Sequence, residues 1–166
     1  MAAAATDQAR EGMGTTLVAA LLNVEGHALI ANVGDSRAYY VPGSPPASES
    51  DARLITVDHT WVNEQVRGGQ MSEAEARRSP MRHLLTRSLG AQPDVEIDLF
   101  DALPLAPGDA LVLVSDGVSG YLDERDVATL LHAAPSAQAA ADGLVGAAVA
   151  RGGADNATAV VVRRRG

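Results

Sequence analysis

Three aspartates of this sequence could share metal ions, because each lies where an apolar run ends and beside glycine, serine or asparagine. They are Asp35 in Gly-Asp-Ser, Asp116 in Ser-Asp-Gly and Asp155 in Asp-Asn. Carboxylates that converge at one rim of a sheet repel each other unless cations neutralise them. Oxygen ligands suit hard octahedral ions, so the pattern points to Mg²⁺ or Mn²⁺. For any one aspartate a capped turn is the better explanation; the three together favour a metal site.

The composition excludes several other chemistries. The chain has no cysteine and no lysine, which rules out a thiolate nucleophile, a cysteine zinc site, a P-loop lysine and a Schiff base. Its 166 residues are 46% hydrophobic, as expected for one globular domain. The net charge of −8 argues against a nucleic-acid partner. No run approaches the roughly 18 apolar residues of a membrane span, so we expect a cytoplasmic protein with no membrane segment.

Apolar and alternating runs predict the strands that must position these aspartates. The expected strands cover residues 15–24, 28–33, 38–41, 53–57, 95–99, 110–114 and 157–162. The run at 110–114 has no polar break, which is typical of a strand buried on both faces. Residues 34–37 form a short turn, so the strands on either side of it should pair as a hairpin.

Capping signals predict the helices. Ser72 with Glu75 three residues later forms a capping box within a polar segment at 61–83, which should project from the body as a small flap. Asp123 should cap a helix with apolar residues at helical spacing, and an alanine-rich helix should follow Pro135 and end at Gly152. Strands and helices are segregated along the chain, which predicts an α+β fold of antiparallel sheets with helices packed outside.

Six short motifs, taken in order, resemble those of the metal-dependent protein phosphatases, the PPM family of type 2C serine/threonine phosphatases, and of its bacterial members in particular. The motifs are Gly-Met-Gly-Thr-Thr at 12–16, Gly-Asp-Ser-Arg-Ala-Tyr at 34–39, Asp-His-Thr at 58–60, Leu-Thr-Arg-Ser-Leu-Gly at 85–90, Ser-Asp-Gly at 115–117 and Asp-Asn at 155–156. The resemblance implies a sandwich of two antiparallel β-sheets flanked by helices (α-β-β-α), with metals at one end. It also implies that Asp116 and Asp155 bind two core Mg²⁺ or Mn²⁺ ions, that Asp35 helps hold a third, and that the substrate is a phosphorylated protein.

The resemblance also identifies what this sequence lacks. Family members begin with roughly a third more chain, which holds the arginine that grips the substrate phosphate. The same part holds an Asp-Gly-His-Gly motif with the bridging aspartate and the proposed acid histidine. We therefore expect residues 1–166 to be a partial, N-terminally truncated phosphatase domain with no catalytic residue of its own. His59 belongs to Asp-His-Thr and is better explained as structural.

Two functions stay open at this point, and a plain cation-binding module that uses the same three aspartates is a weaker third. One is a phosphatase domain whose isolated activity is severely impaired; the other is a non-catalytic, phosphatase-like binding module. Retention of all three aspartates favours the first mildly. Strands that lack their neighbours should expose unpaired backbone groups and favour self-association.

Overall fold

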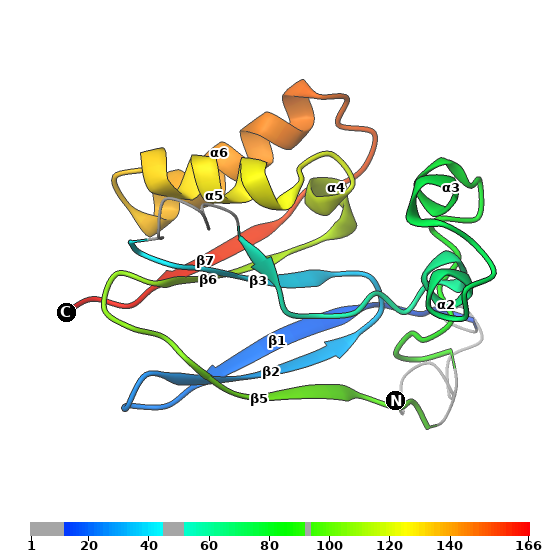
Figure 1. The fold of residues 1–166 in the computed structure, drawn as a ribbon, viewed down its shortest axis with the longest axis horizontal. Helices are drawn as coiled ribbons and strands as arrows, with labels where there is room; N and C mark the ends of the chain where they lie inside the picture. Colours follow the sequence, from blue (N-terminus) through cyan, green and yellow to red (C-terminus); the bar gives the residue numbers. More distant parts are fainter. Residues whose placement is uncertain (1–11, 45–51, 92–93) are drawn as a thin grey trace.

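Strand β6 (Ala110–Val114) is the centre of the fold and pairs with a strand on each side. The computed structural model describes residues 12–44, 52–91 and 94–166. These residues form two antiparallel sheets that pack face to face, with helices over one of them (Figure 1). The sheet containing β6 has the order β4-β3-β6-β7, and the other has the order β1-β2-β5. The remaining strands are β1 (Leu17–Leu22), β2 (His27–Val33), β3 (Arg37–Val41), β4 (Arg53–Leu54), β5 (Asp98–Pro104) and β7 (Ala159–Arg163).

The uninterrupted apolar run of β6 reflects burial on both faces, as its sequence predicts. Leu111 points between the two sheets and joins a cluster with Ile30 of β2. Its neighbour Val112 points the other way and joins a cluster with Leu131 and Leu144 of the helical layer. Because successive side chains of a strand alternate between faces, one strand supplies both halves of the core.

One helical layer covers the β4-β3-β6-β7 sheet. It consists of α4 (Asp116–Ser119), α5 (Glu124–Ala133) and α6 (Ala137–Ala150). Asp123 caps α5 in a reciprocal capping box with Asp126, which confirms the predicted start of that helix. No described helix covers the outer face of the β1-β2-β5 sheet (Figure 1). The two-sheet sandwich with helices is therefore confirmed, and within the described ranges the helices that cover a sheet lie on one side of the sandwich.

The predicted hairpin of β2 and β3 is wrong, because the two strands belong to different sheets. β2 pairs with β1 and β5, whereas β3 pairs with β4 and β6. Gly34 allows this crossing: its φ is +105°, and a Cβ at that position would lie 2.3 Å from Cγ2 of Thr16. The crossing carries Asp35 out at one end of the sandwich.

Residues 61–83 lie beside the sandwich (Figure 1). They contain α2 (Trp61–Arg67) and α3 (Glu73–Arg78). Val62 of α2 is buried, but α3 buries no residue and is held by its Ser72–Glu75 capping box, as predicted. No helix within the described residues is both long and apolar enough to cross a lipid bilayer.

Candidate metal centre and its cleft

Asp35, His83 and Asp116 form a cluster at one end of the sandwich. One ligand atom of each lies within 4.8 Å of the others. Asp35 comes from the crossing between the sheets, Asp116 from the first position of α4 after β6, and His83 from the segment after α3. The structure thus brings two of the three predicted aspartates together and adds a histidine that the motifs did not indicate.

The surroundings of Asp35 destabilise its charged form. Burial raises the pKa of Asp35 above its ordinary value, and the carboxylates of Asp116 and Asp58 raise it further. His83 acts in the opposite direction; its Nδ1 lies 3.8 Å from an Asp116 carboxylate oxygen. Two carboxylates and an imidazole are a suitable donor set for a divalent cation, and a cation here would relieve the repulsion.

His59 holds the backbone that carries Asp35. It is only 5% exposed, and its Nδ1 accepts a hydrogen bond of 3.1 Å from the Gly34 N–H. Its own backbone N–H donates to the Gly34 carbonyl at 3.0 Å. Because Nδ1 accepts, Nε2 carries the proton and donates to Asp98 at 3.1 Å. The imidazole therefore links the crossing to strand β5.

Asp98 is in turn fixed by Arg87, which donates to it at 2.8 Å. Burial acts to raise the pKa of Asp98, but the hydrogen bonds and charges of His59 and Arg87 outweigh burial and hold that pKa below its usual range. The hydrogen bonds that link Gly34, His59, Asp98 and Arg87 are thus a continuous support behind the acid cluster.

A second support is the ion pair of Arg37 and Asp58 on the wall of the cleft. The guanidinium donates two hydrogen bonds to the carboxylate, at 2.9 and 2.7 Å. Burial acts to lower the pKa of Arg37, but Asp58 outweighs it and raises the pKa above its ordinary value. The Asn63 side chain also donates to the Asp58 carbonyl at 2.7 Å, which ties α2 to this wall.

Asp155 lies outside the group of three. It is exposed on the loop before β7, and its carboxylate accepts a 2.7 Å hydrogen bond from the Asn156 N–H. This loop is fastened to the start of α4: Ser115 Oγ donates to the Asn156 carbonyl at 3.3 Å, and the Thr158 N–H donates to Ser115 Oγ at 3.0 Å. A Cβ on Gly117 would lie 2.3 Å from the Asn156 carbonyl oxygen, so only glycine permits this approach.

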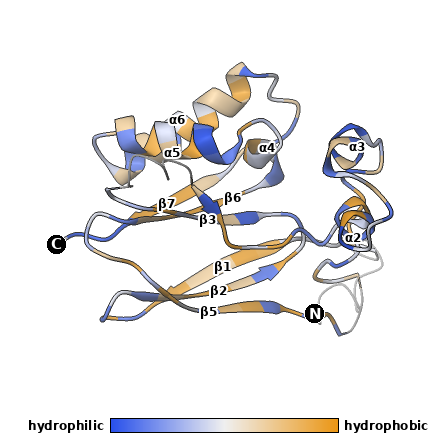
Figure 2. Cartoon of the chain, in the orientation of Figure 1, coloured by the Kyte–Doolittle hydropathy of each residue, from blue (hydrophilic) through white to orange (hydrophobic). Residues whose placement is uncertain are grey.

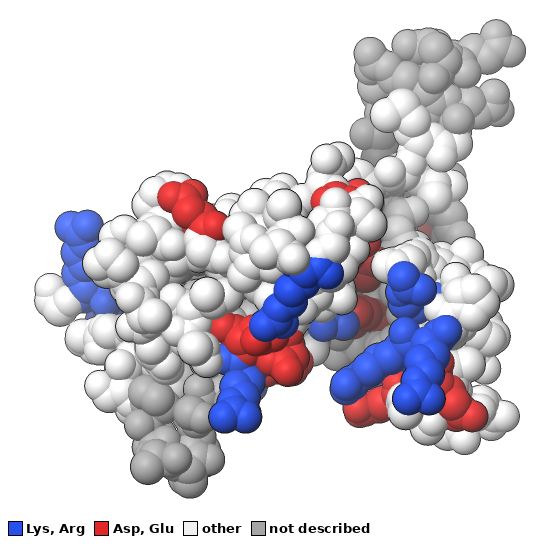
Figure 3. Space-filling view, turned by 90° about the horizontal axis from the view of Figure 1, so that it is seen from above, with Lys and Arg blue, Asp and Glu red and all other residues white. Residues whose placement is uncertain are grey.

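The acid cluster faces a cleft of about 600 Å³ between residues 61–83 and the helical layer. Seen from above, a hollow separates α3 from that layer, and acidic side chains lie in it (Figure 3). The lining includes Asp35, His83 and Asp116 together with Arg82. The cleft is open enough for a side chain that carries a charged group to reach the cluster.

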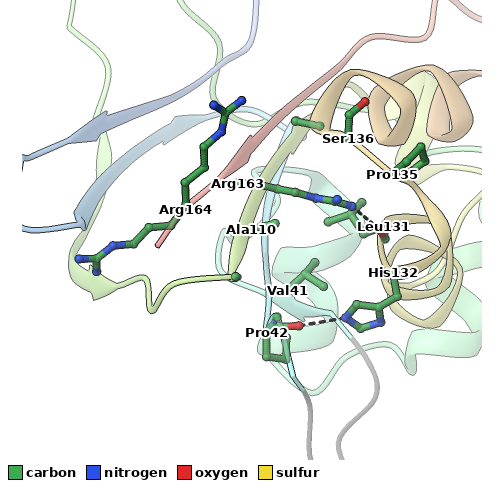
Figure 4. Close-up of a pocket in the computed structure, with 13 residues that line it drawn as sticks. Val41, Pro42, Ala110, Leu131, His132, Pro135, Ser136, Arg163 and Arg164 are labelled. Carbon is green, nitrogen blue, oxygen red and sulfur yellow. Dashed lines mark hydrogen bonds between the residues drawn. The ribbon is translucent and has the colours of Figure 1, made fainter.

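A second pocket, of about 450 Å³, lies at the other end of the sandwich. Arg163 crosses it to donate to the carbonyls of Leu131 and Ala134, and His132 forms a 2.9 Å hydrogen bond with the Pro42 carbonyl (Figure 4). Arg163 thus joins the carboxyl end of α5 to β7, and His132 joins it to the residue after β3. Two of the pocket's polar side chains, Arg163 and His132, are thus occupied with structural contacts.

Solved structures similar to this chain include bacterial protein phosphatases. Serine/threonine phosphatase Stp1 from Staphylococcus aureus superposes with a TM-score of 0.85 and 33% identity, covering 98% of this chain and 61% of its own. The catalytic domain of the serine/threonine phosphatase PstP, solved with two manganese ions, gives a TM-score of 0.76 and 30% identity, covering 96% of this chain and 63% of its own.

Sequence comparison points to the same family. Serine/threonine phosphatase stp of Listeria welshimeri is 37% identical over 153 residues, which are 92% of this chain and 58% of that protein. No protein-family model matches the chain. The chain belongs to the metal-dependent protein phosphatase family, as its six motifs predicted. It spans about three-fifths of the length of the curated relatives that it matches.

Proposed function

We propose that this chain is the metal-holding part of a serine/threonine phosphoprotein phosphatase that hydrolyses phosphate monoesters. The observation that carries the proposal is the group of Asp35, His83 and Asp116 within 4.8 Å, in a chain similar to a phosphatase solved with two manganese ions. In this proposal Asp35 and Asp116 hold Mg²⁺ or Mn²⁺, and His83 completes the group. Asp155 is assigned to a metal by the family resemblance, and its exposed position leaves its carboxylate accessible from solvent.

The residues of this chain would hold and orient the cation and shape the approach to it. Bound divalent cations lower the pKa of water and polarise phosphoryl oxygens. The His59 support fixes Asp35, and the Arg37–Asp58 pair fixes one wall of the cleft. Residues 61–83 act as the flap that borders the substrate. By the family resemblance, the phosphate-binding arginine and the acid histidine would lie in the part of the domain that this chain does not span, so we expect the chain alone to be severely impaired as an enzyme. The proposed substrate is a phosphorylated protein of the cytoplasm.

Manganese binding tests this proposal without requiring turnover. Titration of Mn²⁺, followed by electron paramagnetic resonance, should show saturable binding by the purified chain. Asp116→Asn and Asp35→Asn should each weaken binding by at least about tenfold, because even partners outside the first coordination sphere typically contribute that much. Asp142→Asn, an exposed acid on α6, is the matched control and should bind as the wild type does. Displacement by Mg²⁺ then ranks the two cations.

Unchanged binding in both Asp35→Asn and Asp116→Asn would exclude this cluster as the metal site. Equal weakening by Asp142→Asn would show that the ion responds only to the chain's negative charge.

A further inference from the structure

The cleft in front of the acid cluster carries an excess of negative charge. Seven acidic side chains line it against four arginines. Three of these arginines already pair with acids of the same lining: Arg37 with Asp58, Arg77 with Glu73, and Arg151 with Asp126. Four acids of the lining have no arginine partner within the described residues. Asp35 and Asp116 belong to the acid cluster, so Asp123 and Glu124 are the two whose charge is still unexplained.

Asp123 and Glu124 lie where α5 begins, at the edge of the helical layer that borders the cleft; we call this pair the acidic rim. Asp123 caps the helix, and its carboxylate accepts a 2.8 Å hydrogen bond from the Asp126 N–H. Glu124 is half-buried in the first turn, and no described residue donates a hydrogen bond to its carboxylate. The first turn of a helix favours a negative charge but supplies no counter-ion. Glu124 is therefore a carboxylate that can accept a cation from outside the chain.

The Glu124 carboxylate lies toward the floor of the cleft. Burial is the main cause that raises the pKa of Tyr39 above its ordinary value, and the negative charge of Glu124 adds to that effect. The Tyr39 hydroxyl in turn accepts a 3.3 Å hydrogen bond from Arg37, which lines the cleft. A cationic group that entered the cleft would therefore come within reach of Glu124.

The opposite wall of the cleft has the opposite charge. The flap contributes Arg82 to the lining, next to His83 of the acid cluster. Figure 3 shows acidic side chains at the edge of the helical layer and arginines on the facing side of the flap, and Figure 2 shows that these facing elements carry hydrophilic residues. The cleft thus favours a ligand that is anionic near the acid cluster and its cation, and basic where it passes the acidic rim.

We propose that the acidic rim selects phosphoprotein segments that carry arginine or lysine close to the phosphorylated residue. This inference rests on the proposed function, in which the phosphoryl group lies at the metal centre. The neighbouring basic side chain then pairs with Glu124, while an acidic neighbour would be repelled. Ion pairs between partly exposed groups typically change affinity by up to about fivefold. The acidic rim is thus a determinant of specificity and holds no metal.

Binding of phosphopeptides to the chain loaded with Mn²⁺ tests the proposal without requiring turnover. Three fluorescent peptides share a central phosphoserine and carry arginine, alanine or glutamate on both sides of it. Fluorescence anisotropy should show the arginine peptide binding about fivefold more tightly than the alanine peptide, and the glutamate peptide binding most weakly. Glu124→Gln should remove most of this preference and leave Mn²⁺ binding unchanged. Asp123→Asn combined with Glu124→Lys should place the glutamate peptide first, because asparagine can still cap α5.

The matched control is Asp142→Asn, which removes an exposed acid of α6 outside the cleft and should keep the wild-type order. Equal binding of the three phosphopeptides, no measurable binding of any of them, a preference that survives in Glu124→Gln, or an equal loss of preference in Asp142→Asn would overturn the acidic rim.

Two outcomes separate this proposal from the proposed function. Equal binding of the three phosphopeptides that is lost in Asp116→Asn would overturn the acidic rim and support the proposed function. An arginine preference that requires Glu124, but is unchanged by Asp116→Asn and by removal of the phosphoryl group, would support the acidic rim and overturn the proposed function.

Discussion

At the scale of single residues, the cluster is held by groups that do not belong to it. Asp35 sits on a backbone crossing between two sheets, and the buried His59 clamps that crossing by accepting from the Gly34 N–H and donating to Asp98. Removing the imidazole leaves a buried N–H without its acceptor. The proposed metal centre therefore depends on a residue that need not touch the metal.

Replacing His59 with leucine should lower both stability and metal affinity. The unpaired Gly34 N–H is expected to cost about 1–3 kcal/mol in the free energy of unfolding, measured in urea. Mn²⁺ binding should weaken as well, because Asp35 loses its fixed position. His27→Leu is the control, since that side chain is 44% exposed and its nearest charge is Glu25 at 3.8 Å. Unchanged stability in His59→Leu would show that the crossing is held without the imidazole.

The sequence pattern indicated Asp35 and Asp116 as candidate ligands because each follows a strand and adjoins glycine. It did not find His83, which follows a polar helical segment with no local sign that the chain returns to Asp116. That return is a tertiary event: backbone hydrogen bonds join Trp61 to Leu84 and Thr86 to His59. Local patterns indicate acids at turns, but they do not show which distant side chain arrives beside them.

At the scale of elements, an ion pair joins the two long helices. Arg151, just after α6, pairs with Asp126 in the first turn of α5 and donates to the Tyr121 carbonyl at 2.9 Å. Asp126 also accepts from the Asp123 N–H at 3.1 Å as part of the capping box. The hydrogen bond from Arg151 is the largest cause that lowers the pKa of Asp126 to about 2, and the hydrogen bond from the Asp123 N–H and the charge of Arg151 lower it further. One carboxylate thus caps α5 and ties it to α6.

Asp126→Asn should therefore destabilise the protein in a pH-dependent way. The folded-state pKa of Asp126 lies below its unfolded value of about 3.9, so its contribution is complete above that value. The contribution is lost as the pH falls toward about 2. We expect Asp126→Asn to melt below the wild type at pH 7 and the difference to narrow below pH 4. The control is Glu73→Gln, which breaks the solvent-exposed pair with Arg77 and should change little. A melting difference that is constant from pH 7 to pH 2.5 would contradict the ion-pair explanation.

Most strands and helix caps could be predicted, but strand pairing could not. The apolar runs locate β2 and β3 correctly, yet the short turn between them suggested a hairpin where the chain crosses between sheets. The alternation predicted a strand at 95–99, whereas β5 begins at Asp98 because its register with β2 starts at Asn32 opposite Asp98. The bounds of a strand depend on the partner strand that supplies its hydrogen bonds, and the local sequence does not identify that partner.

At the scale of the whole molecule, the two sheets are unequally covered. The segregated order of strands and helices correctly predicted antiparallel sheets with helices outside them. It could not predict which sheet the helices cover. In the structure α5 and α6, which both follow β6, pack back onto the sheet that contains β6. The other sheet contributes Ala28 and Ile30 to the core, and no helix within residues 12–44, 52–91 and 94–166 covers its opposite side.

This asymmetry predicts that the isolated chain associates with itself. Each large apolar side chain left uncovered forgoes roughly 1.5–3 kcal/mol, and a domain is held together by only about 5–15 kcal/mol. Sedimentation velocity should show species larger than the monomer, and thermal melting should give a broad or low transition. Leu21→Asp combined with Leu99→Asp should shift the chain toward monomer, whereas Val149→Asp should not, because only the first pair lies on the β1-β2-β5 sheet. A monodisperse wild-type monomer with a cooperative transition above about 60 °C, high for an ordinary domain, would mean that the two sheets and one helical layer already close a sufficient core. In that case the apolar face would be a tolerated surface, and its residues could be made polar without effect on assembly.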